Sequence, residues 1–197
     1  MDTNPIDLVS DAEAASAAKN RLNTRVALTV ALLATFMGVC KVKDDNIVQA
    51  MQQAQADRID HWSFYQAKNV REQMAQSTAD QLRAQALAFP ANAAPFQAAA
   101  VRYDSLAANE RAKKEQVRKQ AEQDQVTYDA LNFHDDQFDL SDALAAIAIS
   151  LLAVTSLTQK RWLYLLAMLA ASIAVVMGLA GLLEWQLHSD LLARLLS

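Results

Sequence analysis

The stretch WLYLLAMLAASIAVVMGLAGLLEW, residues 162–185, decides the fold class of this protein. Its only charged residue is Glu184, next to the last position, and a tryptophan stands at each end. A helix of this length rises about 36 Å, which exceeds the roughly 30 Å hydrocarbon core of a bilayer. Tryptophan is enriched at both membrane–water interfaces. The stretch therefore predicts a transmembrane helix over 162–185.

Two more apolar blocks precede this stretch. Residues 142–158 form an alanine-rich block, and only the basic turn QKR, residues 159–161, separates it from the last block. Residues 26–42, VALTVALLATFMGVCKV, lie between two basic residues and carry no charge before Lys41. Each block is long enough for a short span. We therefore predict three transmembrane helices, the last two of which form a tight hairpin.

A secretory signal is the alternative interpretation of the first block. The block lacks a small-x-small cleavage site, and the sequence MGV before Cys40 lacks the small residue that directly precedes a lipidated cysteine. We therefore favour an uncleaved anchor. Cys40 is the only cysteine, which excludes a disulfide framework and a cysteine-based zinc site.

The basic residues near the spans predict the orientation of the chain. One side carries Lys19, Arg21, Arg25, Lys160 and Arg161, against Lys41, Lys43 and Arg194 on the other. The positive-inside rule then places an amphipathic N-terminal segment, residues 1–25, in the cytoplasm. The middle segment, residues 43–141, and the C-terminal tail, residues 186–197, become periplasmic. This topology corresponds to a multi-pass protein of the bacterial inner (cytoplasmic) membrane.

The middle segment predicts a long helical hairpin. No glycine or proline occurs from Asp44 to residue 88, and alanine, glutamine and arginine dominate. The run FPANAAPF, residues 89–96, supplies two prolines and an asparagine and predicts the turn. A second arm follows to about Leu131, and we expect an irregular segment over 132–141. The predicted fold is thus an all-α membrane protein with a long antiparallel coiled-coil hairpin between its first and second transmembrane helices.

The spacing of large apolar residues suggests how the two arms pack. They recur every eleven positions: Val48, Ile59 and Val70 in the first arm, and Leu106, Val117 and Tyr128 in the second. Eleven residues correspond to three turns at 3.67 residues per turn, which predicts a straight or slightly right-handed coil.

Three aromatic residues stand close together in the first arm. Trp62 shares a face with Ile59 and Val70 and is predicted to join the seam between the arms. Phe64 and Tyr65 face elsewhere, because neighbouring helix positions point in different directions. They predict a contact between subunits, or alternatively packing against residues 132–141. All three, Trp62, Phe64 and Tyr65, are candidate oligomer contacts.

Small residues mark one face of the last apolar block. Ala170, Ala174 and Gly178 repeat at intervals of four. Such a face allows close approach of another transmembrane helix. We expect it to pack on the second apolar block or on another subunit, so these residues are also candidate oligomer contacts.

No motif for catalysis or cofactor binding is present. The chain has three glycines and no Walker loop, dinucleotide-binding pattern, nucleophile elbow or HExxH. The basic run at 111–119 is interleaved with glutamates, so solvated ion pairs explain it better than nucleic acid binding. We therefore expect no enzyme activity, no cofactor and no nucleic acid partner.

One acidic cluster precedes the second apolar block. It contains His134, Asp135, Asp136 and Asp139, with Asp142 at the start of the block. Such a cluster can hold a divalent cation or attract cations to a pore. The alternative is a solvated face that answers Lys41 and Lys43, with Asp142 capping the second span. We favour the second interpretation and predict no metal site.

The run KVKDDNIVQAMQQAQADRIDHWSFYQAKNVRE, residues 41–72, with ALLATFMGVC before it, resembles a family of uncharacterised bacterial membrane proteins catalogued as a domain of unknown function. Its most specific parts are KDDNIVQAMQQAQAD and FYQAK. The resemblance extends over nearly the whole chain and implies three spans with a large helical insertion. It supplies no catalytic residues.

These observations lead to one main hypothesis and two alternatives. The main one is a homo-oligomeric inner-membrane scaffold whose hairpins project about 60–70 Å from the bilayer. The second is an oligomeric ion channel lined by Ser150, Thr155 and Ser156 beneath an acidic vestibule. The third is an accessory subunit of a complex with other membrane proteins.

Overall fold

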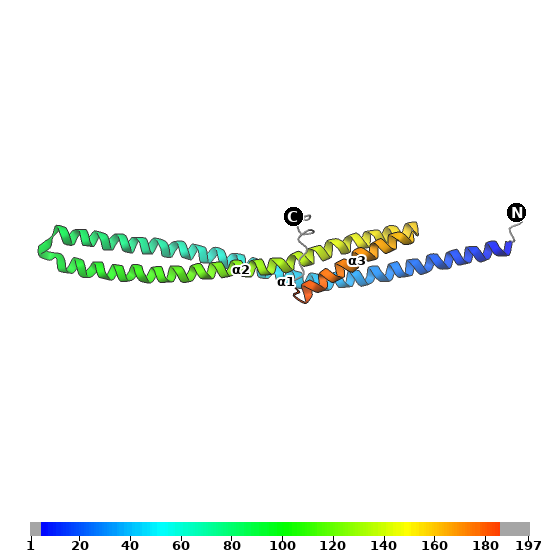
Figure 1. Ribbon diagram of the computed structural model, residues 1–197, viewed down its shortest axis with the longest axis horizontal. Coiled ribbons are helices and arrows are strands. Elements are labelled where there is room, and N and C mark those ends of the chain that lie inside the picture. Colours follow the sequence, from blue (N-terminus) through cyan, green and yellow to red (C-terminus); the bar gives the residue numbers. More distant parts are fainter. Residues whose placement is uncertain (1–4, 186–197) are drawn as a thin grey trace. The chain divides into compact units, whose positions relative to one another are not determined.

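The computed structural model describes residues 5–185 of the chain. Its elements are α1 (Pro5–Ala88), a single 3-10 turn η1 (Pro90–Asn92), α2 (Ala93–Thr158) and α3 (Arg161–Leu182) (Figure 1). No strand occurs within this range, and the all-α prediction is confirmed. Each of the three α-helices contains a stretch long and apolar enough to cross a membrane. The predicted tail, residues 186–197, lies outside the described residues.

Two of the helices are longer than the sequence patterns predict. α1 joins the N-terminal segment, the first apolar block and the first arm in one helix. α2 continues through residues 132–141 into the second apolar block, so the prediction of an irregular segment there is wrong. The run HDDQFDLSD contains neither glycine nor proline, and nothing in it stops a helix. Asp142 consequently lies inside α2 and does not cap it.

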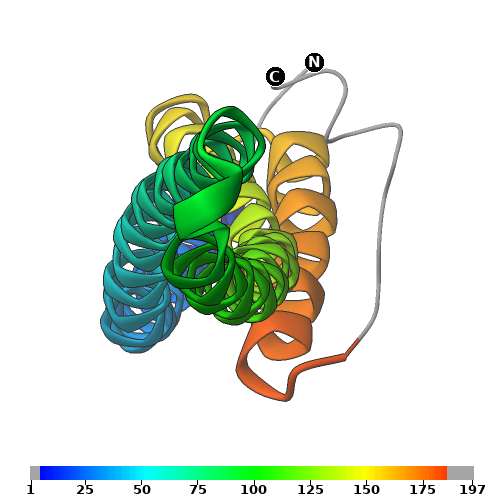
Figure 2. The ribbon, with the colours of Figure 1, turned by 90° about the vertical axis from the view of Figure 1, so that its left-hand side faces the viewer.

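The chain reverses direction at the two predicted turns. Phe89 and η1 separate α1 from α2 (Figures 1 and 2). Gln159 and Lys160 separate α2 from α3, and Gln159 adopts a φ of 58°. The Gln159 amide donates a hydrogen bond to Asn23 Oδ1 at 2.9 Å, which ties this turn to α1.

Among the described residues, one compact unit comprises 5–48 and 131–185. α3 lies along the C-terminal part of α2 in both views (Figures 1 and 2). The core takes two residues from each helix: Val26 and Leu33, Ala148 and Leu152, and Ala167 and Ala171. Small side chains dominate on α2 and α3, so these two helices approach closely.

Gly178 shows how close this packing is. A Cβ atom there would lie 2.7 Å from the Phe36 ring and 2.8 Å from Ser141 Oγ. Ser141 Oγ in turn donates a hydrogen bond to the carbonyl of Ala174 at 2.8 Å. The small-residue face of α3 therefore packs on α2 and α1 of the same chain, which is one of the two expectations for it.

The second unit comprises residues 49–130, the two arms and their connection. Buried apolar residues in the arms are spaced by three, four or multiples of seven: Met51, Ala54, Ala75, Ala79 and Ala86, and then Ala100, Ala107 and Ala121. This is heptad spacing, which corresponds to left-handed packing of the helices. The predicted eleven-residue pattern is wrong, because Ile59 and Val70 are 56% and 52% exposed.

Candidate functional site

The acidic cluster is built around Asp44, which α1 contributes. Asp44 is 5% exposed, and its Oδ2 accepts a hydrogen bond from Lys41 Nζ at 2.7 Å. Its Oδ1 is buried without such a donor. Asp44 is one of the groups that raise the pKa of Asp135 on α2. Two carboxyl groups can share a hydrogen bond only when one of them keeps its proton.

The surroundings of Asp135 favour the protonated form. Burial, its hydrogen bond to Asp44 and the charge of Asp139 raise the pKa of Asp135 to about 6. Burial and the charges of Asp44 and Asp136 also raise the pKa of Asp139. Carboxyl groups crowded in this way cannot all ionise without mutual repulsion.

The other two members of the predicted cluster face different partners. His134 Nδ1 lies 3.2 Å from Gln137 Oε1, one turn along α2. Asp136 is exposed and accepts a hydrogen bond from Asn132 Nδ2 at 3.4 Å. Within residues 5–185, no three His, Cys, Asp or Glu side chains are arranged to hold a metal ion. Lys43 pairs with Glu184 at 3.4 Å, so of the two expected lysines only Lys41 lies in the cluster.

A second group of charges lies in the seam between the two arms. Lys68 Nζ lies 3.1 Å from Glu110 Oε2, and Lys114 Nζ lies 2.6 Å from Glu72 Oε2. Both glutamates are buried. Lys68, which hydrogen-bonds Glu110, lowers the pKa of that carboxyl group despite its burial. Our sequence analysis missed these pairs, although all four residues fall on heptad positions.

A histidine and an aspartate also face each other across the seam. His61 Nδ1 lies 2.6 Å from Asp124 Oδ2. Buried charged pairs constrain which residues face each other, because an unpaired buried charge is strongly unfavourable. The seam therefore fixes the register of the arms with ion pairs while alanines supply most of its apolar contacts.

Two of the three candidate aromatic residues, Trp62 and Tyr65, are placed differently from the prediction. Tyr65, not Trp62, lies toward the second arm, where Lys114 Nζ stands 5.9 Å from its ring centroid. Trp62 is 38% exposed and packs edge-to-face on Tyr65, with the ring centroids 5.3 Å apart. Phe64 is 58% exposed. Of the three aromatic candidates, Phe64 presents the most open surface.

An apolar groove on the surface of the arms is a further candidate contact. Met74 of α1 and Tyr103 and Leu106 of α2 line a cavity of about 430 Å³, and the rest of its lining is Arg71, Ala75, Thr78 and Glu110. Met74 is shared with a neighbouring hollow that Val70 lines. We call Val70, Met74, Tyr103 and Leu106 the arm groove. All four side chains are exposed in the single chain.

The hydroxyl groups considered as pore lining are largely used within the chain. Thr155 is fully buried and its hydroxyl donates to the carbonyl of Leu151 at 2.8 Å. Ser156 is half-buried, 3.4 Å from Asn23 Oδ1. Only Ser150 of the three is exposed. The Ser150 hydroxyl also donates to a carbonyl of its own helix, that of Ala146, at 2.8 Å.

A family model covers most of the chain. Residues 22–184 match the family described as Domain of unknown function (DUF4337). The chain belongs to this family. The resemblance inferred from residues 41–72 is therefore confirmed, and the DUF4337 match includes both units of the structure. No curated protein and no solved structure shows significant similarity to the chain.

Proposed function

We propose that the protein is a three-pass protein of the bacterial inner membrane that assembles with copies of itself into a structural scaffold. In this proposal the helices cross the bilayer at residues 26–42, 142–158 and 162–185. The N-terminus is cytoplasmic and residues 43–141 are periplasmic. The two arms form an antiparallel coiled coil, and the proposal assigns no catalytic residue and no cofactor.

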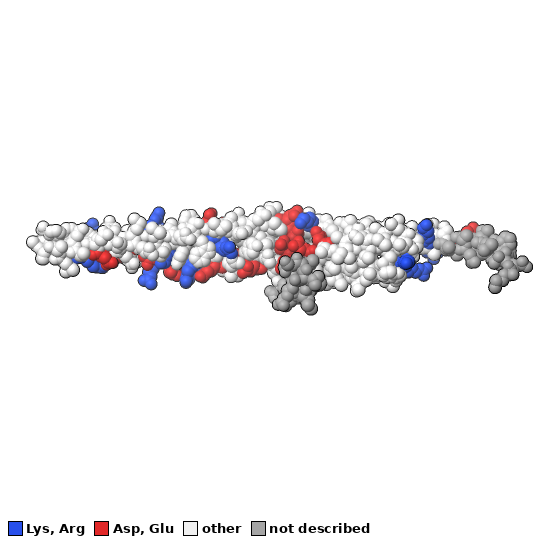
Figure 3. Space-filling view, turned by 90° about the horizontal axis from the view of Figure 1, so that it is seen from above, with Lys and Arg blue, Asp and Glu red and all other residues white. Residues whose placement is uncertain are grey.

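The distribution of charge supports the membrane assignment. No charged residue occurs from 26 to 40 in α1, from 143 to 158 in α2, or from 162 to 182 in α3. On the face shown in Figure 3, a surface without charge separates acidic side chains from basic ones. The charge-free stretches rise about 22–32 Å, comparable with the hydrocarbon core of a bilayer.

The single observation that carries the scaffold proposal is the arm groove. Two helices whose seam consists of alanines and ion pairs bury little apolar surface, and such a pair is marginal by itself. Met74 and Leu106 nevertheless stay 64% and 45% exposed. Exposed apolar surface of this kind marks protein contacts, and a second copy of the arms would cover it.

The mass of the complex in mild detergent tests the proposal. We expect size exclusion with light scattering to give several copies of the chain for the natural protein. Met74→Gln together with Leu106→Gln should shift the peak toward monomer at the same protein concentration. The matched control is Leu87→Gln with Val126→Gln, which changes one exposed apolar residue on each arm outside the groove.

Each other outcome has a definite meaning. A natural protein that runs as a monomer would overturn the scaffold. Unrelated chains in the peak would support the accessory-subunit alternative instead. Equal dissociation by the groove pair and by the control pair would show that the arm groove is not the contact, and Phe64→Ser would then test the remaining aromatic candidate.

A further inference from the structure

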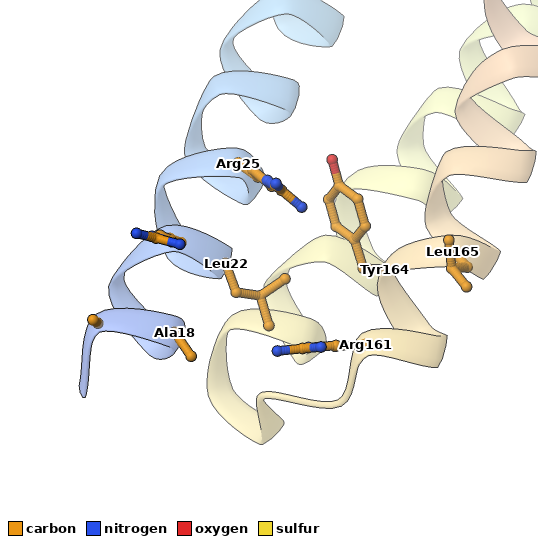
Figure 4. A pocket seen from close by; sticks show the side chains of 8 residues that line it. Ala18, Leu22, Arg25, Arg161, Tyr164 and Leu165 are labelled. Atoms are coloured by element: carbon orange, nitrogen blue, oxygen red, sulfur yellow. The ribbon is translucent and has the colours of Figure 1, made fainter. Parts of the chain in front are cut away.

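A cavity of about 660 Å³ lies between the N-terminal part of α1 and the start of α3. Arg21 and Arg25 of α1 and Arg161 of α3 line it, with Leu22, Tyr164 and Leu165. In Figure 4 the guanidinium groups of Arg25 and Arg161 and the ring of Tyr164 point into the space between the two helices. Three exposed arginines therefore border one opening.

These three arginines have no acidic partner in the part of the chain that the structure describes. None of the ion pairs over residues 5–185 involves them. The sequence contains no Asp or Glu from 14 to 43 or from 143 to 183. Like charges gathered without a counter-ion repel each other. An anion in the cavity would relieve that repulsion.

The ligand chemistry of the cavity favours a phosphate group. Guanidinium groups bind phosphate oxygens in a bidentate manner. The cavity also lies at the amino end of α3, whose N-cap residue, Lys160, makes no side-chain capping hydrogen bond. The partial positive charge of a helix N-terminus favours an anion there.

A separate apolar groove lies further along the same two helices. It has a volume of about 470 Å³, and Leu32 and Phe36 of α1 and Met168 and Val175 of α3 line it. The two spaces are adjacent: the Tyr164 hydroxyl of the cavity lies 3.4 Å from the Thr29 hydroxyl of the groove. The groove is about 10 Å long from Thr29 to Phe36, at the helical rise per residue.

We propose that α1 and α3 together bind an anionic phospholipid, with its phosphate headgroup among Arg21, Arg25 and Arg161 and one acyl chain in the groove beside Phe36. A basic cavity with an apolar groove next to it matches a molecule with an anionic head and an apolar tail, and basic pockets between transmembrane helices bind such headgroups. This site rests on the membrane insertion proposed above, but it does not depend on the scaffold.

Binding of defined lipids by the full-length protein in detergent tests the site. Native mass spectrometry would compare phosphatidylglycerol and cardiolipin with phosphatidylcholine, and glycerol phosphate would serve as the soluble anion. We expect the anionic lipids to bind at least about tenfold more strongly than phosphatidylcholine. The triple variant Arg21→Gln, Arg25→Gln, Arg161→Gln should lose this preference.

A matched control carries the same change of charge elsewhere. Arg58→Gln, Arg102→Gln, Arg111→Gln removes three arginines from the arms, and it should bind anionic lipid as the natural protein does. Ser172→Phe fills the groove from an exposed position and should weaken lipid binding without affecting glycerol phosphate. Circular dichroism of every variant would verify that the helices are retained.

Three results would overturn the lipid site. The first is equal affinity for neutral and anionic lipid, and the second is an equal effect of the two triple variants on lipid binding. The third is binding of glycerol phosphate as tight as that of lipid, together with lipid binding that Ser172→Phe does not change. The last would indicate a site for soluble anions. Two controls separate these results from failure of the proposed function. A protein that does not insert into the membrane would not float with liposomes. The same mass spectra report the number of copies of the chain and so test the scaffold.

Discussion

At the scale of single residues, the pair Asp44 and Asp135 is the most unusual feature of the chain. Lys41, one turn away on α1, donates a hydrogen bond to one carboxylate oxygen of Asp44. The other oxygen is buried and has no nitrogen or hydroxyl donor. The raised pKa of Asp135, about 6, means that its carboxyl group keeps a proton in mildly acidic solution. In this protonated form Asp135 can donate a hydrogen bond to Asp44, and without the proton the two carboxyl groups cannot form one.

Stability should therefore fall as the pH rises through this range. The pKa of Asp135 is about 6 in the folded protein and about 3.9 in an unfolded chain. Between these values the folded state binds more protons, so unfolding becomes easier as the pH rises from about 4 to 6. Because Asp135 is partly exposed, we expect an effect on the order of 1 kcal/mol.

Asp135→Asn checks this directly. The amide can donate to Asp44 at every pH, so the variant should have a higher melting temperature at pH 7 and a flatter pH dependence from 4 to 6. Asp136→Asn is the control, because it removes an equal charge from an exposed neighbour. Equal gains from both variants would mean that general repulsion, and not the carboxyl pair, is responsible.

At the scale of the helices, the turns could be predicted from the sequence and the seam between the arms could not. The turns at 89–96 and 159–161 were predictable because proline and a short polar break leave few alternatives. The seam was not predictable from large apolar residues, because Ile59 and Val70 stay outside while alanines face inward. Alanine is common throughout the arms and gives little periodic signal, and the charged seam residues resemble a solvated surface until their partners are known.

The contact of α3 with α1 and α2 depends on the absence of a side chain at Gly178. Gly178→Ala would place a methyl group 2.7 Å from the Phe36 ring and 2.8 Å from Ser141 Oγ, so these side chains or their helices must shift. We expect a loss of about 1–3 kcal/mol, as for other overpacked cores. Gly38→Ala is the matched control, since nothing lies within 4 Å of its added methyl group.

Thermal unfolding in one detergent compares the two variants. Gly38→Ala should be neutral or slightly stabilising, because alanine is the better helix former. If Gly178→Ala unfolds at the same temperature as Gly38→Ala, then α3 does not pack closely on α1 and α2 in solution, and the small residues of α3 become available for contacts between subunits.

At the scale of the whole molecule, the positions of the charged residues and the lengths of the apolar stretches predict most of the architecture. The three apolar stretches were recognisable from sequence because a bilayer demands long runs without charge. The basic cavity was harder to predict. Arg21, Arg25 and Arg161 were useful for orientation, but 136 positions separate Arg25 from Arg161, and only the fold brings them to one opening. The three arginines line this opening at the predicted cytoplasmic end of the spans. The orientation of the chain therefore also decides which leaflet contains the proposed lipid site.

Orientation is testable with single cysteines. In a Cys40→Ala background, Ala91→Cys marks the turn between the arms, and Lys160→Cys marks the turn between α2 and α3. We expect a membrane-impermeant maleimide to label position 91 in spheroplasts and position 160 only after lysis, as the positive-inside rule requires. The reverse pattern would invert the chain and place the three arginines in the periplasmic leaflet. Labelling of both positions before lysis would contradict the three-pass topology itself, because an odd number of spans separates them.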